Sequence, residues 1–262
     1  MRILRNAIIA ASFFSLALAT TLHAETFEDW QHTMAKRARA EGIKKKTIRN
    51  YLFTTKENDA VIALDRKQPE GTLGYAEYRK IATSGKIVRG RAMLQKHRKL
   101  LNIIGNKYGV DPEVIVALWG METDYGRNCG NISTLDALAT LAYEGRRSEF
   151  FSGELLILLK LIDNGEIDPK NLHGSWAGAM GQTQFMPSSF LKYAVDYNKD
   201  RHKDIWHNES DIFASIANYL KTEGWEKGAI SMTDVTTPEN FDRALADLNI
   251  SKKIAEWKEL GV

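Results

Sequence analysis

Glu122 is the residue whose type and position most favour acid–base chemistry. It falls in the stretch WGMETDYG at residues 119–126. Ile115, Leu118 and Glu122 occupy one face of the helix that this region predicts, so the carboxylate is expected to point toward the apolar interior. Burial raises the pKa of a carboxyl group, and a glutamate that stays protonated near neutral pH can act as a general acid.

The ends of this helix are marked in the sequence. Asp-Pro at 111–112 is typical of a helix start, because aspartate can cap free amides and proline fits the first helical position. Gly126 ends the helix within about a turn of Glu122, which brings the negative end of the helix dipole close to the carboxylate. The alternative is a structural role, in which Glu122 lies at the edge of the core and pairs with Arg127 or Arg146.

Residues 174–187 (GSWAGAMGQTQFMP) are predicted to form a binding loop. The segment has little periodicity and combines three glycines with the polar residues Ser175, Gln182 and Gln184. Glycine lets a ligand approach the backbone closely, and neutral amides can form hydrogen bonds with sugar hydroxyl and acetamido groups. An ordinary loop before a helix that starts at Pro187 is the alternative, but this density of glycine and amide favours a binding surface.

A possible metal loop follows. Four oxygen-bearing side chains alternate in the stretch DYNKDRHKD: Asp196, Asn198, Asp200 and Asp204. The pattern resembles the first half of an EF-hand calcium loop, but the sixth position is Arg201 and the twelfth is His207. The nearest later acids, Glu209 and Asp211, lie beyond the twelfth position. A structural ion and a solvated acidic loop both remain open, so the metal assignment is unknown, and no cofactor is predicted.

The elements that would position these residues are predicted to be mainly helical. Ser133, with Asp136 three residues on, resembles a capping box for a helix through Tyr143. Ser210 is predicted to cap a helix whose buried stripe includes Tyr219 and which ends before Gly224. Residues 64–74 are interpreted as a connecting arm. Further helices are predicted at residues 27–40, 45–52, 89–108, 148–162, 238–248 and 251–260.

The first 24 residues predict export. Arg2 and Arg5 precede an apolar run at residues 7–19, and cleavage is expected after Ala24. The run is too short to favour a spanning helix, and no cysteine lies near the cleavage point, so neither a transmembrane nor a lipid anchor is indicated. The mature protein is expected to be soluble and periplasmic.

Charge and cysteine content exclude several classes of function. Removal of Arg2 and Arg5 lowers the formal net charge from +3 to +1. A net charge this close to zero does not favour binding to nucleic acid. Cys129 is the only cysteine of the sequence, so no internal disulfide can form. It is interpreted as a packed residue.

Four ordered motifs resemble the B-type membrane-bound lytic murein transglycosylases, which share a lysozyme-like catalytic core. They are WGMETDYG, LDALATL at 135–141, FFSGE at 150–154 and GSWAGAMGQTQFMPSSF at 174–190. The resemblance covers roughly residues 64–225. It implies a mainly α fold of the α+β lysozyme-like superfamily, with a helical N-terminal arm at 25–95 and a catalytic core at 96–225. It also implies that the substrate and partner is the glycan strand of peptidoglycan.

The resemblance also implies roles for particular residues. Glu122 matches the single catalytic acid/base of the family. Ser175 and Gln184 match residues that line the sugar cleft, as do Tyr219 in ANYL and Tyr78 in YRK. Tyr219 also fits a core position, because a buried tyrosine can pack and still present its hydroxyl.

The sequence offers one candidate catalytic carboxylate, Glu122, and no obvious second one, which bears on the mechanism. Asp124 lies about 200° round the helix from Glu122, so it does not fit the partner that a two-carboxylate glycosidase needs. The family then implies that Glu122 protonates the bond between N-acetylmuramic acid and N-acetylglucosamine and that the muramoyl 6-hydroxyl attacks, leaving a 1,6-anhydro end. A hydrolytic muramidase and a weak or inactive peptidoglycan-binding protein are the alternatives.

Residues 226–262 are expected to form an incomplete C-terminal segment. In the family this region continues to a segment with tyrosine and asparagine that returns to the cleft, whereas no tyrosine follows Tyr219 here. The chain is therefore predicted to be shortened. Glu122 is expected to be more exposed on one side, and its pKa less raised, than in a closed site.

Overall fold

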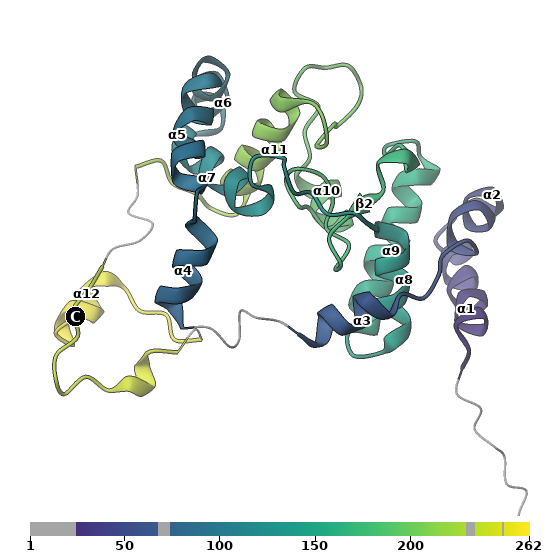
Figure 1. Ribbon diagram of the computed structural model, residues 1–262, viewed down its shortest axis with the longest axis horizontal. Helices are drawn as coiled ribbons and strands as arrows, with labels where there is room; N and C mark the ends of the chain where they lie inside the picture. Colours follow the sequence, from purple (N-terminus) through teal and green to yellow (C-terminus); the bar gives the residue numbers. More distant parts are fainter. Residues whose placement is uncertain (1–24, 68–73, 229–233, 248) are drawn as a thin grey trace, which may run out of the picture.

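Helices make up most of the described chain, and they are joined by loops of varied length and one small sheet (Figure 1). The structure is a computed structural model that describes residues 25–67, 74–228, 234–247 and 249–262. The mainly α fold expected from the sequence is confirmed. The predicted export signal at residues 1–24 lies outside the described residues.

The described elements follow one another in this order: α1 (Phe27–Ala40), α2 (Lys45–Thr47), the π-helix η1 (Ile48–Leu52), α3 (Asp59–Arg66), α4 (Tyr75–Thr83), α5 (Lys86–Lys96), α6 (Arg98–Tyr108), α7 (Pro112–Thr123), β1 (Ile132–Ser133), α8 (Thr134–Glu144), α9 (Ser148–Asp163), the 3₁₀ turn η3 (Pro169–Asn171), β2 (His173–Gly174), α10 (Pro187–Tyr193), α11 (Glu209–Thr222), the 3₁₀ turn η4 (Arg243–Leu245) and α12 (Ile254–Glu259). Within these ranges, no helix is both long and apolar enough to cross a lipid bilayer.

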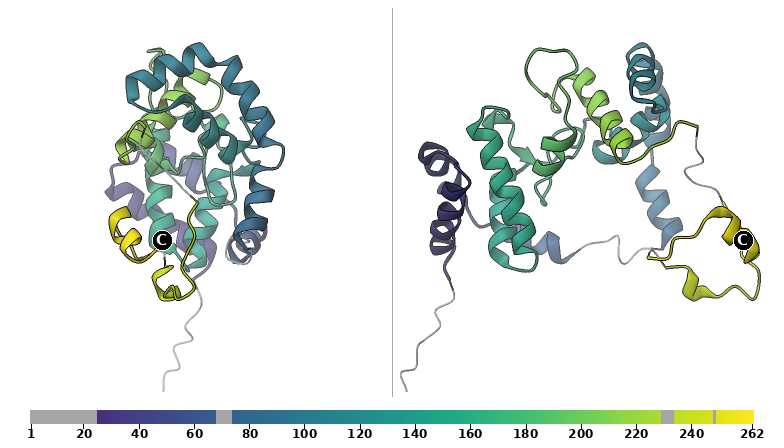
Figure 2. Two further views of the ribbon diagram at one scale, coloured as in Figure 1. Left: turned by 90° about the vertical axis from the view of Figure 1, so that its left-hand side faces the viewer. Right: turned by 180° about the vertical axis from the view of Figure 1, so that it is seen from behind.

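The first of two apolar clusters is built around α8 and α9, which a short turn connects. α9 directs a stripe at helical spacing into it: Leu155, Leu158 and Leu159. From α1, which lies beside this pair in Figure 2, Trp30 and Met34 enter the same cluster. The first helices are thus held by the core of α8 and α9, and the domain boundaries at 95 and 225 stay predictions.

The second apolar cluster joins α6, α7 and α11. Trp119 of α7 is central to it, because its ring meets Phe213 of α11 at 5.1 Å and His97 at 5.9 Å, both edge to face. Ile104 and Ile115 are fully buried beside these rings. The helix that carries Glu122 is therefore fixed along its inner face by aromatic packing.

One small sheet brings the predicted binding loop next to the segment that follows α7. β1 and β2 pair antiparallel, with Ile132 opposite Gly174 and Ser133 opposite His173. Isolated bridges then join Gly174 to Met180 and Met180 to Phe185. Residues 174–187 are thereby folded on themselves against the end of the α7 region.

The prediction of one long helix at residues 89–108 is wrong, because the chain breaks into α5 and α6 at His97. His97 leaves helical geometry at φ −102° and ψ 11° and buries its ring against Trp119 and Phe213. Its Nδ1 lies 3.1 Å from a carboxylate oxygen of Glu209. Tertiary packing of one side chain therefore overrides a continuous helical pattern.

Of the other predicted helix boundaries, some are confirmed and some are wrong. The starts at Pro112 and Pro187 and the helix at 27–40 are confirmed, but Asp111 makes no side-chain cap. α11 is capped by Asn208, not by Ser210. Ser133 caps α8 as predicted, whereas the helix predicted at 238–248 is reduced to the single turn η4.

Three of the other predicted segments also differ in detail. The helix expected at 45–52 is α2 followed by the π-helix η1, and the one at 251–260 is α12. The arm predicted at 64–74 begins inside the last turn of α3, and its residues 68–73 lie outside the described residues.

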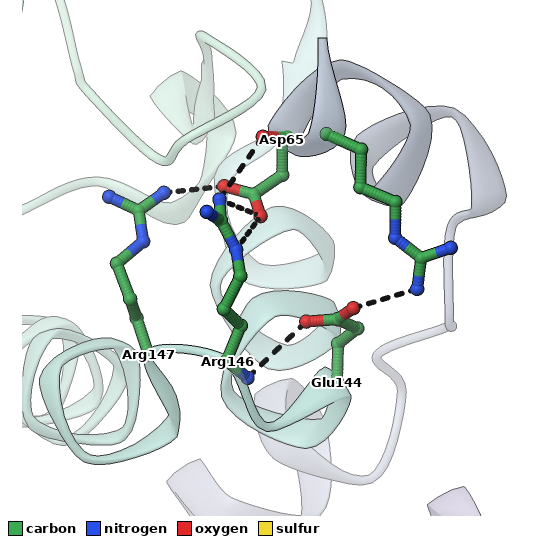
Figure 3. A network of polar contacts seen from close by, with 5 residues as sticks. Asp65, Glu144, Arg146 and Arg147 are labelled. Atoms are coloured by element: carbon green, nitrogen blue, oxygen red, sulfur yellow. Dashed lines mark hydrogen bonds and ion pairs between the residues drawn. The ribbon is translucent and has the colours of Figure 1, made fainter. Parts of the chain in front are cut away.

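A buried carboxylate fastens α3 to the turn between α8 and α9 (Figure 3). Asp65, whose side chain is 3% exposed, accepts hydrogen bonds from the guanidinium groups of Arg146 and Arg147. Beside it, Arg66 donates to Glu144 at 2.9 Å. Burial by itself would raise the pKa of Asp65, but the two arginines together hold that pKa below its ordinary value.

Replacement of Asp65 by Asn is expected to lower the free energy of unfolding by about 1–3 kcal/mol, because three charge-assisted hydrogen bonds from two arginines weaken while the arginines stay half-exposed. Since the pKa of Asp65 is depressed, this contribution is present above the ordinary carboxyl value of 3.8 and is lost as the pH falls below it. Urea unfolding from pH 7 to pH 3 measures both effects. Glu149→Gln, in the exposed pair with Arg37, is the control, where about 0–1 kcal/mol is expected.

Candidate functional site

Glu122 is the last residue but one of α7, and the chain changes direction directly after it. The helix ends at Thr123, and the next three residues all take left-handed backbone angles: Asp124 at φ 51°, Tyr125 at 64° and Gly126 at 79°. The helix stop predicted at Gly126 therefore begins two residues earlier. A run of two non-glycine residues at positive φ is strained, so contacts elsewhere must hold it.

The Glu122 side chain is exposed to solvent, so the prediction that it points into the interior is wrong. Enough protein surrounds the carboxylate that partial burial raises its pKa, while the positive charge of Lys86 opposes the shift. It makes no hydrogen bond or ion pair within the described residues. The alternative of a structural pair also fails, because Arg127 pairs with Asp124 and Arg146 with Asp65.

Asp124 follows the last residue of α7 in a left-handed conformation, so its predicted helical position does not apply, and its carboxylate is already paired. Its Oδ1 accepts hydrogen bonds from Nε and Nη2 of Arg89 at 2.9 and 2.7 Å, and Arg127 lies 3.7 Å from its Oδ2. Arg89 belongs to α5, so this carboxylate joins α5 to the end of α7. Asp124 is therefore a structural anchor.

Tyr125 folds back over α7 and fixes α5 against it. Its hydroxyl donates to the carbonyl oxygen of Lys86 at 2.8 Å, and its ring packs on Trp119 at 5.4 Å. A Cβ added at Gly120 would lie 2.5 Å from the Tyr125 ring, and one at Gly90 would lie 2.5 Å from its hydroxyl. The two glycines make room for this tyrosine, and Lys86 comes to lie near Glu122 as a result.

Gln184 lies in the binding loop, and only the nitrogen of its side-chain amide is hydrogen-bonded. Its backbone is left-handed at φ 49°, and its Nε2 donates to the carbonyl oxygens of Cys129 and Gly181 at 3.1 and 2.9 Å. Its Oε1 has no hydrogen-bond partner within the described residues. An acceptor held in place in this way suits a ligand hydroxyl or N–H group.

Ser175 lies at the other end of the same loop. Its Oγ accepts a hydrogen bond from the amide of Ala179 at 3.1 Å, and the backbones of the two residues are also bonded. Because the hydroxyl accepts in this bond, its proton is left for donation outward. Ser175 and Gln184 are thus both half-buried in the loop and each keeps one hydrogen-bonding function.

Gln182, the third polar residue of the predicted binding loop, is a structural link. Its Oε1 accepts from Nε1 of Trp119 at 2.8 Å, and its Nε2 donates to the carbonyl oxygen of Trp206 at 2.7 Å. Its backbone amide donates to Ile205, and its carbonyl accepts from Oγ1 of Thr123 at 3.1 Å. In the sequence, only the family resemblance separates this glutamine from Gln184.

Tyr219 and Tyr78 lie in different surroundings. Tyr219 of α11 is half-buried, and its ring packs against Tyr193 at 5.0 Å and Phe185 at 6.0 Å, so the predicted core role is met in part. Phe185 is the residue after Gln184, which brings Tyr219 close to the loop. Tyr78 of α4 is 41% exposed, and its side chain has no hydrogen bond or ring contact in the described part of the chain.

The structure brings the loop and the end of α7 together, but it does not place all five candidates in contact. The links run from Thr123 to Gln182 and from Gln184 to Cys129. Glu122 adjoins these links without taking part in them. The shared cleft of Glu122, Ser175 and Gln184 therefore stays a prediction.

The acids of the possible metal loop are turned toward the loop's own backbone. Asp196, Asp200 and Asp204 each accept hydrogen bonds from loop amides. The fully buried Asp211 of α11 reaches back and accepts three more, at 2.8–3.4 Å; burial raises its pKa and these bonds partly offset the rise. Across the described ranges, no group of three or more His, Cys, Asp or Glu side chains is arranged to hold a metal ion.

Replacement of Gly120 by Ala is expected to lower the melting temperature, with a loss of about 1–3 kcal/mol, because the new methyl would overlap the Tyr125 ring. In an ordinary helix this change stabilises by up to about 1 kcal/mol. Gly153→Ala in α9 is the matched control, since an added Cβ there meets no atom within 4 Å. Equal stabilisation by both substitutions would contradict the packing of Tyr125 over α7.

Comparison with known proteins agrees with the motifs. Residues 26–262 match the transglycosylase SLT domain family. The chain is 39% identical over 209 residues to membrane-bound lytic murein transglycosylase B of Escherichia coli (strain K12), a match that covers 76% of this chain and 58% of that protein.

Solved structures show the same relationship. SltB3 from Pseudomonas aeruginosa in complex with NAG-NAM-pentapeptide is 41% identical, with a TM-score of 0.82, and the match covers 90% of this chain and 64% of SltB3. SltB3 was also solved with NAG-anhNAM-pentapeptide. Escherichia coli lytic transglycosylase Slt35 in complex with calcium is 40% identical, with a TM-score of 0.67 and coverage of 76% and 64%.

The chain thus spans about 58–64% of the length of these relatives. The family match extends over nearly all of the described residues, and the motifs around Glu122 and in the 174–187 loop lie within it. The chain belongs to the transglycosylase SLT domain family.

Proposed function

We propose that this protein is a lytic murein transglycosylase that cleaves the β-1,4 bond between N-acetylmuramic acid and N-acetylglucosamine of peptidoglycan. The observation that carries the proposal is Glu122, a carboxylic acid with a raised pKa and no partner in the described structure, beside the glycine- and amide-rich loop. SltB3, a relative in this family, was solved with a peptidoglycan fragment and with its anhydro form.

The proposed reaction uses Glu122 first as an acid and then as a base. Protonated Glu122 donates its proton to the glycosidic oxygen, and the bond from that oxygen to the anomeric carbon breaks. The acetamido group of the muramoyl residue stabilises the positive charge at the anomeric carbon. The Glu122 carboxylate then takes the proton of the muramoyl 6-hydroxyl, whose oxygen attacks that carbon and closes a 1,6-anhydro ring. Water does not enter the products.

The state of Asp124 supports a one-acid mechanism. A retaining or inverting glycosidase needs a second free carboxylate opposite its acid. Here Asp124 is held by Arg89 and lies beside Arg127, so its carboxylate is not free. Internal attack by the substrate's own hydroxyl removes the need for that second group.

The proposed sugar contacts come from the loop and the two tyrosines. Ser175 has a hydroxyl proton to donate, and Gln184 has an amide oxygen to accept, so the pair can bind an acetamido or hydroxyl group from both sides. Tyr219 would present its hydroxyl beside Gln184, while Tyr78 would contribute from α4. We assign these four residues to substrate binding and not to proton transfer.

One observation favours a second function. Glu122 is exposed to solvent, and an open carboxylate is desolvated less than one in a closed site. A weakly active or inactive peptidoglycan-binding protein would share this feature, and a muramidase that admits water would share the acid. The products separate the three, since only a transglycosylase leaves 1,6-anhydro ends.

We further propose that the protein works in the periplasm after removal of residues 1–24. The basic start, the apolar run and the small residue at Ala24 support export.

Replacement of Glu122 by Gln is expected to abolish glycan cleavage without changing the fold, because the amide has nearly the same shape but cannot donate the catalytic proton. Digestion of purified peptidoglycan followed by mass analysis of the fragments is the measurement. Wild type should release fragments 18 Da lighter than hydrolysis products, which is the mass of one water. Cleavage by the variant at the wild-type rate would show that Glu122 is not the acid.

Alanine at Ser175 or at Gln184 is expected to remove one or two hydrogen bonds to the substrate. The loss of transition-state stabilisation, measured as a decrease in kcat/KM, is expected to be about 1–3 kcal/mol. Gln184→Ala also frees the carbonyl oxygens of Cys129 and Gly181, so its melting temperature is measured in parallel. Wild-type kcat/KM in both variants would move the sugar site away from this loop.

A further inference from the structure

Gln182 lies where the two apolar clusters of the fold meet. Trp119 belongs to the cluster of α6, α7 and α11, whereas Met180 and Phe185, on either side of Gln182, belong to the cluster of α8 and α9. Gln182 itself bonds to Trp119 on one side and to the segment with Ile205 on the other. Polar contacts through this one residue thus span the boundary between the two clusters.

The last turn of α7 is attached to Gln182 at two points. Nε1 of Trp119 donates to its side-chain oxygen at 2.8 Å, and Oγ1 of Thr123 donates to its backbone oxygen at 3.1 Å. Trp119 and Thr123 are one helical turn apart, and Glu122 lies between them in sequence. The two bonds therefore fix the turn that carries Glu122.

The end of α7 needs such an attachment. Helix ends fray, and this one stops a single residue after Glu122 and continues into three left-handed residues. Gly126, the third of them, leaves room for the glutamine, because a Cβ there would lie 2.3 Å from Oε1 of Gln182. The amide of Gly126 also donates to Oγ1 of Thr123 at 3.0 Å. The turn after the helix and the glutamine are therefore packed as one unit.

We propose that Gln182 is a positioning residue for the reaction: by holding Trp119 and Thr123, it fixes the carboxylate of Glu122 relative to the sugar-binding loop. The inference rests on the proposed function in one respect, that Glu122 is the group to be positioned. A misplacement of about 1 Å at a reacting group can lower a rate by about a hundredfold, so a link this close to the acid bears on turnover.

The charged groups around Glu122 set the expected direction of its titration. Lys86 of α5 lowers the pKa of Glu122 and burial raises it, with burial the larger effect. Asp124 is neutralised by Arg89 and Arg127, and the thiol of Cys129 lies in the loop that follows. If the last turn loosens, water replaces protein around the carboxylate and its pKa falls. Because Glu122 must be protonated to donate, activity would then be lost at a lower pH on the alkaline side.

The test is Gln182→Leu, which keeps the size of the side chain and removes both of its hydrogen bonds. We expect kcat on peptidoglycan to fall about ten- to a hundredfold while KM stays within about twofold. The pKa of Glu122, measured by carbon-13 NMR of its carboxyl group in the free enzyme, is expected to be lower than in the wild type. Thr123→Val should give the same changes, and Thr123→Ser, which keeps the hydroxyl, should restore wild-type values.

Gln31→Leu is the matched control for general destabilisation. Gln31 is buried, and its Nε2 donates to the carbonyl oxygens of Leu52 and Thr55 and to Oγ1 of Thr55. Leu52 belongs to the cluster of α8 and α9 and not to the cluster that contains Trp119. This variant should lower the melting temperature and leave both kcat and the pKa of Glu122 unchanged.

Three results would overturn the inference or separate it from the proposed function. An unchanged Glu122 pKa and kcat in Gln182→Leu, or equal changes in Gln31→Leu, would show that Gln182 only stabilises the fold. If Gln182→Leu does not fold, the two Thr123 variants give the decision. If wild type does not cleave glycan, the proposed function fails, and the NMR comparison still decides whether Gln182 positions Glu122.

Discussion

The hydrogen bonds between the last turn of α7 and Gln182 are the contact on which the candidate site depends. Trp119 and Gln182 are 63 residues apart in sequence, and their side chains meet at 2.8 Å. Together with the β1–β2 pairing and the bond from Gln184 to Cys129, this contact joins the turn that carries Glu122 to the loop that carries Ser175 and Gln184.

Apolar packing explains why a polar link is found here. Each cluster buries its own helices, α8 and α9 in one and α6, α7 and α11 in the other, so the boundary between them is crossed by loops. Loop backbones carry amide and carbonyl groups that need partners when they are buried. Gln182 makes four hydrogen bonds across this boundary, two through its side chain and two through its backbone.

The electrostatics around Glu122 follow from the same arrangement. The side chains of the three residues that follow it form hydrogen bonds with other partners: Thr123 with Gln182, Asp124 with Arg89, and Tyr125 with the carbonyl oxygen of Lys86. Glu122 alone is left without a partner in the described structure, and partial burial raises its pKa even though its side chain reaches solvent. A lone carboxyl group in this state is suited to donate a proton and accept one in turn.

The sequence by itself determined the features that depend on neighbouring residues. Proline at positions 112 and 187 marked two helix starts, and Ser133 marked a third. The motifs around Glu122 and in the 174–187 loop were sufficient to indicate the family. Caps and periodicity act within one or two turns, so they are legible in a linear sequence.

Tertiary structure alone decided the features that depend on distant partners. The break at His97 requires the rings of Trp119 and Phe213, and the inward turn of Asp211 requires the amides of a loop that ends several residues earlier. Gln182 and Gln184 are the same residue type two positions apart, yet one is a structural link and the other keeps a free acceptor. Glu122 was assigned to an apolar face by its spacing, but its side chain is exposed to solvent, with protein surrounding the carboxylate only in part. Spacing along a helix fixes which residues share a face, whereas packing decides what that face meets.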